Sequence, residues 1–127
     1  MVEGRGTGQL HVDIKAARHK IESGISVKDG GRDEAPSPHA LLEAALASCT
    51  ILTLELYAKR KEWTIGTTAC QVRIESESAS GTVMERTISF SETLTPEIRD
   101  RLEQIANKCP VHRVLSGSVT INTHLLG

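Results

Sequence analysis

The sequence contains few aromatic residues and no cluster of basic ones. Only one Phe, one Trp and one Tyr occur among the 127 residues, so a hydrophobic core has to be built from aliphatic side chains. Lys and Arg together number 15, against 16 Asp and Glu, and no basic run or aromatic-studded basic patch is present. Because nucleic-acid-binding surfaces are usually strongly basic, we expect no nucleic-acid partner.

The sequence also lacks an apolar leader. Its first residues, MVEGRGTGQLHVDIK, have no apolar core of a secretory signal. We further expect no stretch that reaches the roughly 18 apolar residues needed to cross a bilayer. These absences predict a cytoplasmic protein with no membrane partner. Thiols stay mostly reduced in the cytoplasm, so the three cysteines do not indicate a structural disulfide framework.

Local patterns predict an α+β fold. The length suits one domain over residues 1–127, and runs of strands between helices favour α+β over a doubly wound parallel sheet. Period-2 and period-3.6 apolar patterns, prolines and turn residues define the elements. The predicted elements are strands at 9–16 and 19–27, a helix at 38–62, strands at 64–78 and 82–94, a helix at 95–108, a helical turn at 110–115 and a strand at 117–126.

The helix predicted at 38–62 is apolar on nearly every side. A helix of that kind is expected to be buried all round. One small sheet covers only one side of it, so we expect a second subunit to cover the rest. Its apolar residues are Leu41, Leu42, Ala44, Ala45, Leu46, Ala47, Ile51, Leu52, Leu54 and Leu56.

Two of the cysteines lie in apolar surroundings. Cys70 falls on the apolar face of a predicted strand, and we interpret it as a small buried hydrophobic residue. Cys49 lies in the middle of the long helix, where the pattern fits a core residue as well as a reactive thiol. A thiol in such a place stays protonated unless a positive group lowers its pKa. A reactive Cys49 therefore requires a cation from elsewhere in the fold.

Cys109 has a more telling position, directly before Pro110. Proline at the first helical position places Cys109 at the cap, where free backbone N–H groups point at its sulfur. His112 and Arg113 follow within one turn, and all of these features favour the thiolate. A purely structural cap with a solvated His-Arg pair remains the alternative.

The pair Cys109 and His112 also has the spacing of half a metal site. Zinc usually takes four ligands, and the other histidines show no second paired spacing. We therefore expect neither a metal nor another cofactor. The histidines concerned are His11, His19, His39 and His124.

Two segments resemble the OsmC/Ohr family of osmotically induced and organic hydroperoxide resistance proteins. They are APSPHALLEAALASCTILTLELYAKRKEW and CPVHRVL. The likeness is to the branch with a PSP…SCT helix and a CPVHR motif, and it extends from about Gly8 to the end. It implies a single OsmC-like domain in an intertwined homodimer, with antiparallel sheets wrapped around long central helices.

The resemblance also implies a chemistry. Cys49 matches the peroxidatic cysteine of the family and Cys109 the resolving one, so organic hydroperoxides would be reduced through a Cys49 sulfenic acid and a Cys49–Cys109 disulfide. The reductant would be a dithiol, for example of lipoyl type. The role implied is oxidative-stress defence.

The sequence departs from the family pattern around the activating charges. Active members hold the peroxidatic thiolate with an arginine that a glutamate near the start of the long helix orients. Ten residues before Cys49 stands His39, and Glu43 is the first acid on the helix. Three arginines are candidates for the residue that stabilises the thiolate, and each could equally be an ordinary solvated arginine. They are Arg5, Arg18 and Arg32.

Two other functions remain open. The departure at the acid position also fits a catalytically weak OsmC-like module that binds a small apolar ligand at the dimer interface. The third interpretation is a structural dimer with incidental thiols.

Overall fold

The computed structural model describes all residues 1–127, which form two compact units, Met1–Ala44 and Ala45–Gly127. The first unit is built around a three-stranded antiparallel sheet in the order β1-β2-β3. The strands are β1 (Val2–Gly6), β2 (His11–Ala16) and β3 (His19–Gly24), followed by the short helix η1 (Val27–Asp29). β2 and β3 confirm two predicted strands, whereas β1 was not predicted because its sequence, VEGRG, contains two glycines and a single apolar residue.

Helix α1 (Pro38–Lys61) begins in the first unit and continues through the second. Its start agrees with the sequence, because the Ser37 hydroxyl accepts a hydrogen bond from Ala40 N at 3.1 Å and Pro38 occupies the first turn. Lys59, Arg60 and Lys61 lie in its last turn, where cations complement the negative end of the helix dipole.

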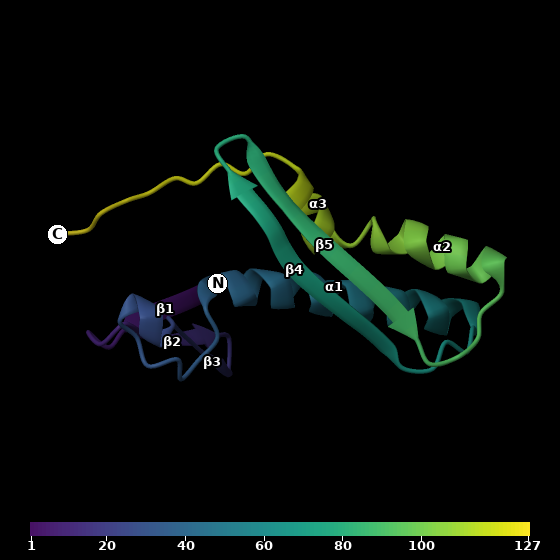
Figure 1. Cartoon of the computed structure of the whole chain (residues 1–127), viewed down its shortest axis with the longest axis horizontal. Helices are drawn as coiled ribbons and strands as arrows, with labels where there is room; N and C mark the ends of the chain where they lie inside the picture. Colours follow the sequence, from purple (N-terminus) through teal and green to yellow (C-terminus); the bar gives the residue numbers. More distant parts are fainter. The chain divides into compact units, whose positions relative to one another are not determined.

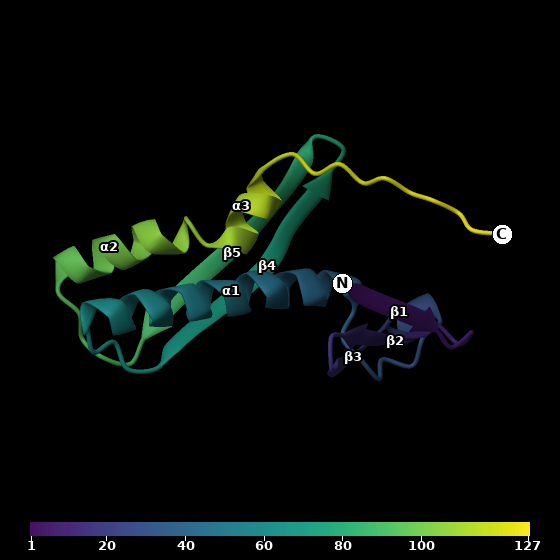
Figure 2. The same cartoon turned by 180° about the vertical axis from the view of Figure 1, so that it is seen from behind.

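The second unit adds a hairpin and two helices to the rest of α1. β4 (Thr68–Ser78) pairs antiparallel with β5 (Gly81–Phe90), and the connecting turn lies where the sequence predicted it. α2 (Pro96–Ala106) and α3 (Pro110–Ser116) follow. Figures 1 and 2 show α2 alongside the C-terminal half of α1, with α3 next to the hairpin.

The core of the second unit lies between α1, α2 and the hairpin. Leu54 of α1 and Leu102 of α2 are 0% and 1% exposed, and burial of one such side chain stabilises the fold by about 1.5–3 kcal/mol. Ile88 and Phe90 of β5 pack against them. This core fixes α1 against the chain segments that carry the remaining cysteines.

In the single chain α1 is covered on one side only, as the sequence analysis expected of this chain's own sheet, and burial of its other sides by a second subunit stays a prediction. Only one stripe at four-residue spacing is buried, namely Leu46, Thr50, Leu54 and Ala58. Leu42, Leu52 and Leu56 are exposed. The physical reason is that α2 and the hairpin cover one side of the helix only.

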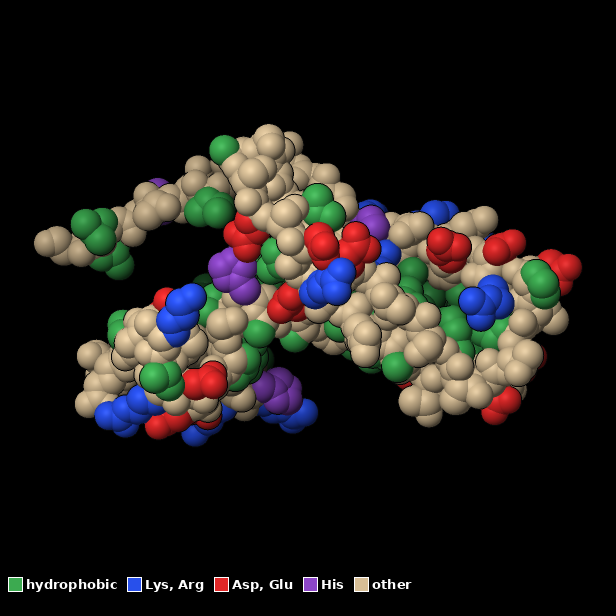
Figure 3. Space-filling model, in the orientation of Figure 1, with side chains coloured by type: hydrophobic (Ala, Val, Ile, Leu, Met, Phe, Trp, Pro, Cys, Tyr) green, Lys and Arg blue, Asp and Glu red, His purple; other side chains and the backbone are tan.

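The predicted strand at 117–126 is also wrong for this chain. Residues after Ser116 form no helix or strand, and Val119 and Ile121 are exposed. Figure 3 shows apolar groups standing out along this terminal segment. Alternating apolar residues form a strand only where a neighbouring strand accepts their hydrogen bonds, and no strand of this chain pairs with them.

The expectation that no segment is long enough to cross a membrane needs correction as well. α1 is long and apolar enough to do so by length and composition alone. The central helix of a protein core meets the same test, and α1 contributes Leu54 and Ala58 to the core of the second unit.

Candidate functional site

Cys109 is the N-cap of α3, as the following proline predicted. Its side chain is 0% exposed, and its sulfur accepts a hydrogen bond from the backbone N–H of His112 at 3.3 Å. Pro110 occupies the first helical position. The first N–H groups of any helix have no partner inside the helix, so the α3 terminus offers donors to a sulfur placed there.

Cys49 lies on α1 next to this terminus and is partly buried. Burial raises the pKa of its thiol, but hydrogen bonds from the backbone N–H of Val111 and from the side chains of Cys109 and Thr53 outweigh burial and lower the pKa below that of an ordinary cysteine. The Thr53 hydroxyl lies 4.0 Å from the sulfur. The structure thus brings Cys109 close enough to Cys49 to lower the pKa of Cys49.

Successive amides of α3 serve the two sulfurs. Val111 N–H points to Cys49 and His112 N–H points to Cys109. The positive group that a reactive Cys49 requires is therefore supplied in part by main-chain dipoles. A backbone donor has no side-chain signature, so sequence reasoning found the proline cap but not its effect on Cys49.

Thr50, the residue after Cys49, contacts Cys109 from the other side. It is 0% exposed, and its hydroxyl donates to the Leu46 carbonyl at 2.7 Å. The same oxygen lies 4.0 Å from Cys109 Sγ. Cys109 is thus held between two neighbouring residues of α1.

Arg86 of β5 is the residue of this site that the sequence analysis missed. Its Nη1 donates to the Thr50 hydroxyl at 3.2 Å, and its Nη2 donates to the side-chain oxygen of Asn107 at 3.0 Å. A usable signal did exist. Along β5, Arg86 alternates with Met84 and Ile88 on the half-buried face, where a charged residue needs a partner.

Cys70 of β4 is a third thiol beside the same group of residues. Burial raises the pKa of Cys70, while the charge of Arg86 and a hydrogen-bond interaction with Thr50 oppose this effect. The charge of Cys109 raises it further. Cys70, which the sequence analysis expected to be a small buried residue, is thus a half-buried thiol in contact with Thr50. Its raised pKa makes it less reactive than Cys49.

The side chains of His112 and Arg113 do not have the role that the sequence analysis expected, which was to favour the Cys109 thiolate. The pKa of the His112 ring is lowered by burial and further by the charge of Arg86, so the imidazole is neutral at physiological pH and the useful group is its backbone N–H. The Arg113 side chain is exposed.

The five residues proposed to activate Cys49 belong to the first unit. Arg5 is exposed and pairs with Glu3 at 3.1 Å. Arg18, in the β2–β3 turn, and Arg32 are exposed as well. His39 and Glu43 lie in the first two turns of α1, and Glu43 stands six residues before Cys49, nearly two helical turns away. Which arginine serves Cys49 from the first unit stays a prediction.

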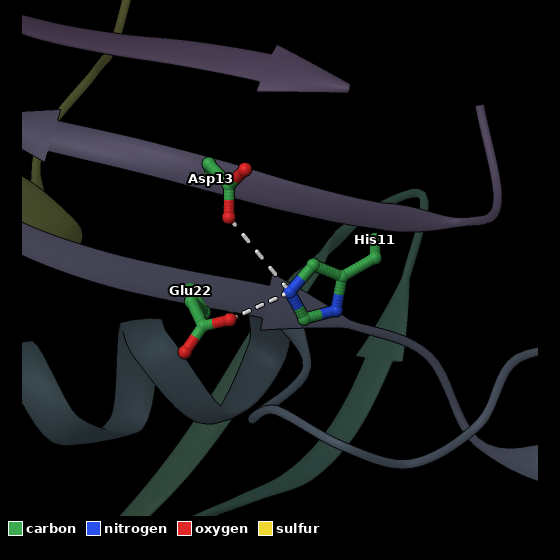
Figure 4. Close-up of side chains that lie close together, drawn as sticks. All are labelled: His11, Asp13 and Glu22. Carbon is green, nitrogen blue, oxygen red and sulfur yellow. Dashed lines mark hydrogen bonds and ion pairs between the residues drawn. The ribbon is translucent and has the colours of Figure 1, made fainter. Parts of the chain in front are cut away.

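One group in the first unit has the spacing of metal ligands. His11, Asp13 and Glu22 offer ligand atoms within 4.8 Å of one another. Figure 4 shows the imidazole facing both carboxylates. His11 Nε2 lies 2.9 Å from Glu22 and 4.0 Å from Asp13. The two carboxylates are opposite one another across β2 and β3 and about two-thirds exposed, at 69% and 62%. Because like charges repel in that position, the imidazole between them acts as their common partner.

Comparison with known protein families identifies the family of this α+β chain. The model of the OsmC-like protein family matches residues 30–124, which is more than half of the chain. The chain therefore belongs to the OsmC-like protein family. Among curated proteins none matches the sequence.

Solved structures show the same fold. A Psychrobacter arcticus protein named for osmotic stress induction and detoxification response is 24% identical, with a TM-score of 0.78 over 89% of this chain and 85% of that one. An OsmC-like protein from Mycoplasma pneumoniae is 19% identical, with a TM-score of 0.75 over 92% and 86%. An organic hydroperoxide resistance protein of Bacillus subtilis is 21% identical, with a TM-score of 0.63 over 92% and 90%. These likenesses confirm the predicted α+β, OsmC-like fold.

Proposed function

We propose that this chain is a thiol-dependent peroxidase that reduces organic hydroperoxides in oxidative-stress defence. The observation that carries the proposal is the position of Cys109, whose sulfur lies 4.0 Å from the hydroxyl of Thr50, the residue after Cys49, and whose side chain lowers the pKa of Cys49. It places a thiol of lowered pKa directly beside a second thiol. The similarity to an organic hydroperoxide resistance protein supports the substrate class.

The first step uses the lowered pKa of Cys49. Its thiolate attacks the outer oxygen of the hydroperoxide, the O–O bond breaks, and the alkoxide leaves and takes up a proton to become the alcohol. Cys49 becomes a sulfenic acid. The Val111 amide and the Thr53 hydroxyl, which stabilise the thiolate, keep Cys49 in the form that reacts.

The second step uses the neighbouring thiol. Cys109 attacks the sulfur of the Cys49 sulfenic acid, a disulfide forms, and the hydroxyl leaves as water with the proton of Cys109. An external dithiol, for example of lipoyl type, then reduces the disulfide by exchange and is itself oxidised to a disulfide. No cofactor is needed in this cycle.

We also propose a homodimer, located in the cytoplasm. The exposed apolar residues of α1 and of the C-terminal segment support the dimer, because apolar surface of this kind is usually covered. They are Leu42, Leu52, Leu56, Val119, Ile121, Leu125 and Leu126.

Binding of a small apolar ligand is the second candidate function. A cavity of about 360 Å³ in the second unit is lined by Leu46, Val83, Met84 and Leu115, with Arg86 at its wall. This volume lies within the roughly 300–1,000 Å³ of small-molecule sites. A ligand carried at one equivalent through native purification, in a protein that consumes no hydroperoxide, is the result that favours this function.

Three serine variants test the peroxidase. Cys49→Ser is expected to abolish hydroperoxide consumption with a dithiol present, and Cys109→Ser to let Cys49 proceed to the sulfinic acid. Cys70→Ser is the matched control and is expected to retain turnover. Hydroperoxide turnover by Cys49→Ser at the wild-type rate would refute the proposal.

A further inference from the structure

Arg86 joins the two chain segments on either side of Cys109. One guanidinium nitrogen donates to Thr50 on α1 at 3.2 Å, and another donates to Asn107 at 3.0 Å, two residues before the cysteine. A planar guanidinium holds two acceptors in fixed directions. Arg86 therefore sets the position of the buried sulfur relative to α1, the helix that carries Cys49.

The hydrogen bonds of Thr50 define the proton arrangement at Cys109. A hydroxyl has one proton to donate and two lone pairs to accept with. Thr50 donates its proton to the Leu46 carbonyl at 2.7 Å, so it accepts from Arg86. Its remaining lone pair faces Cys109 Sγ at 4.0 Å. A Cys109 thiol has one proton, which it can donate either to this oxygen or to Cys49.

The attack on a Cys49 sulfenic acid requires Cys109 to lose that proton. Because Cys109 is 0% exposed, water does not solvate the negative charge that develops on its sulfur, and burial of a bare charge is costly. The groups that can stabilise this charge are the His112 N–H at 3.3 Å and the guanidinium of Arg86 behind Thr50.

The charge of Arg86 is not neutralised by an acid. Both its hydrogen-bond partners are uncharged, and Asp100 and Glu103 of α2 line a cavity with it but form no ion pair. Its field reaches the residues around Cys109. Burial lowers the pKa of His112 and Arg86 lowers it further, while Arg86 opposes the effect of burial on Cys70.

We propose that Arg86 is a positioning residue for the resolving step: through Thr50 and Asn107 it aligns Cys109 with Cys49, and its charge stabilises the Cys109 thiolate as the disulfide closes. The inference rests on the proposed function for the assignment of Cys109 as the resolving thiol. It separates the two steps of the cycle, because Arg86 serves the closure of the disulfide and not the attack on the hydroperoxide.

The titratable and charged groups around Cys109 come from four elements, and each is considered in the test. They are Cys49 on α1, Cys70 on β4, Arg86 on β5 and His112 on α3. All variants are therefore made in a Cys70→Ser background, so that Cys49 and Cys109 are the only thiols that titrate.

Arg86→Gln removes the charge and keeps amide donors, and Arg86→Lys keeps the charge. Arg73→Gln is the matched control, since Arg73 lies on β4, is exposed and pairs with Glu75. One equivalent of cumene hydroperoxide is added, and rapid quenching with mass spectrometry follows the loss of Cys49 thiol and the appearance of the disulfide from pH 5 to 9.

In Arg86→Gln, the hydroperoxide is expected to oxidise Cys49 at the wild-type rate, but the disulfide is expected to form about tenfold more slowly at neutral pH. The reason is that a nearby cation commonly lowers the pKa of an acid by about one pH unit or more. The pH midpoint of closure rises, sulfinic acid accumulates with excess hydroperoxide, and Arg86→Lys recovers most of the closure rate. Closure in Arg86→Gln at the wild-type rate and midpoint would overturn the proposal, as would an Arg86→Lys variant as slow as Arg86→Gln.

A second oxidant separates this inference from the proposed function. The Cys49 thiolate adds to the N=N bond of diamide, and Cys109 then attacks the Cys49 sulfur, so that the S–N bond breaks, the same disulfide forms and the reduced, hydrazine form of diamide leaves. If the wild type ignores hydroperoxide, the peroxidase proposal fails. The Arg86 proposal is then decided by diamide alone: slower closure in Arg86→Gln supports it, and equal closure refutes it.

Discussion

Cys49 and Cys109 lie close together at the start of α3, where the side chain of Cys109 and the backbone of Val111 lower the pKa of Cys49 and the backbone N–H of His112 donates to Cys109 Sγ. Sixty residues separate the two cysteines in the chain. Their meeting depends on α1 packing against the segment between α2 and α3, and the chemistry proposed for the protein depends on the hydrogen bonds that result.

The first prediction concerns the order in which the thiols react. The pKa of Cys49 is lowered and that of Cys70 is raised, and only a thiolate is alkylated efficiently. As the pH rises, Cys49 is therefore expected to become reactive before Cys70, at a pH below that of an ordinary cysteine. Iodoacetamide labelling from pH 5 to 10 with peptide mapping measures this order. Labelling of Cys70 before Cys49 would contradict it.

The second prediction concerns the hydrogen bond from Cys109. Cys109→Ala removes a donor that lowers the pKa of Cys49, so this pKa is expected to rise and labelling at pH 7 to slow. Cys109→Ser keeps a hydroxyl donor and is expected to show a smaller rise. Both variants carry Cys70→Ser, and the pH midpoint of Cys49 labelling is the readout. An unchanged midpoint in Cys109→Ala would show that the contact does not act on Cys49.

The third prediction concerns the stability of the site. Thr50→Val keeps the shape of a fully buried side chain but removes the oxygen that accepts from Arg86. A buried donor left without its partner costs about 1–3 kcal/mol, and because Arg86 is only partly buried, urea unfolding is expected to show a loss near the lower end of that range. Thr53→Val is the control, since Thr53 is only partly buried, and a smaller loss is expected. Equal stability of Thr50→Val and wild type would contradict the network.

The fourth prediction concerns the proposed dimer. Leu52 of α1 is 64% exposed in the single chain, and a charge placed in an apolar interface is costly. Leu52→Glu is expected to shift the protein from dimer to monomer in sedimentation experiments, and so is truncation after Ser116. Lys59→Glu, at an already charged position of the same helix, is expected to remain dimeric. A monomeric wild type would refute the dimer itself.

The elements that carry their own signals were predictable from the sequence. Pro38, Pro96 and Pro110 each mark the start of a helix, because proline is accommodated in a first helical turn. The hairpin of β4 and β5 follows from two alternating runs around a glycine-containing turn. The cap position of Cys109 follows from Pro110 by the same reasoning.

The parts of the fold and of the site that the sequence did not predict depend on contacts between segments that are distant in the chain. β1 forms because β2 offers an edge for pairing, although VEGRG has little strand character of its own. The apolar alternation of the C-terminal segment finds no such edge in this chain. Arg86 lies in a mixed stretch of charged and apolar residues, and only the fold shows that it contacts Thr50 and Asn107.

Titration with one equivalent of an organic hydroperoxide, followed by mapping of all three cysteines, tests the central claim most directly. The account predicts a disulfide between Cys49 and Cys109, with Cys70 left as a free thiol. A Cys49 that stays reduced, or a disulfide that contains Cys70, would contradict it.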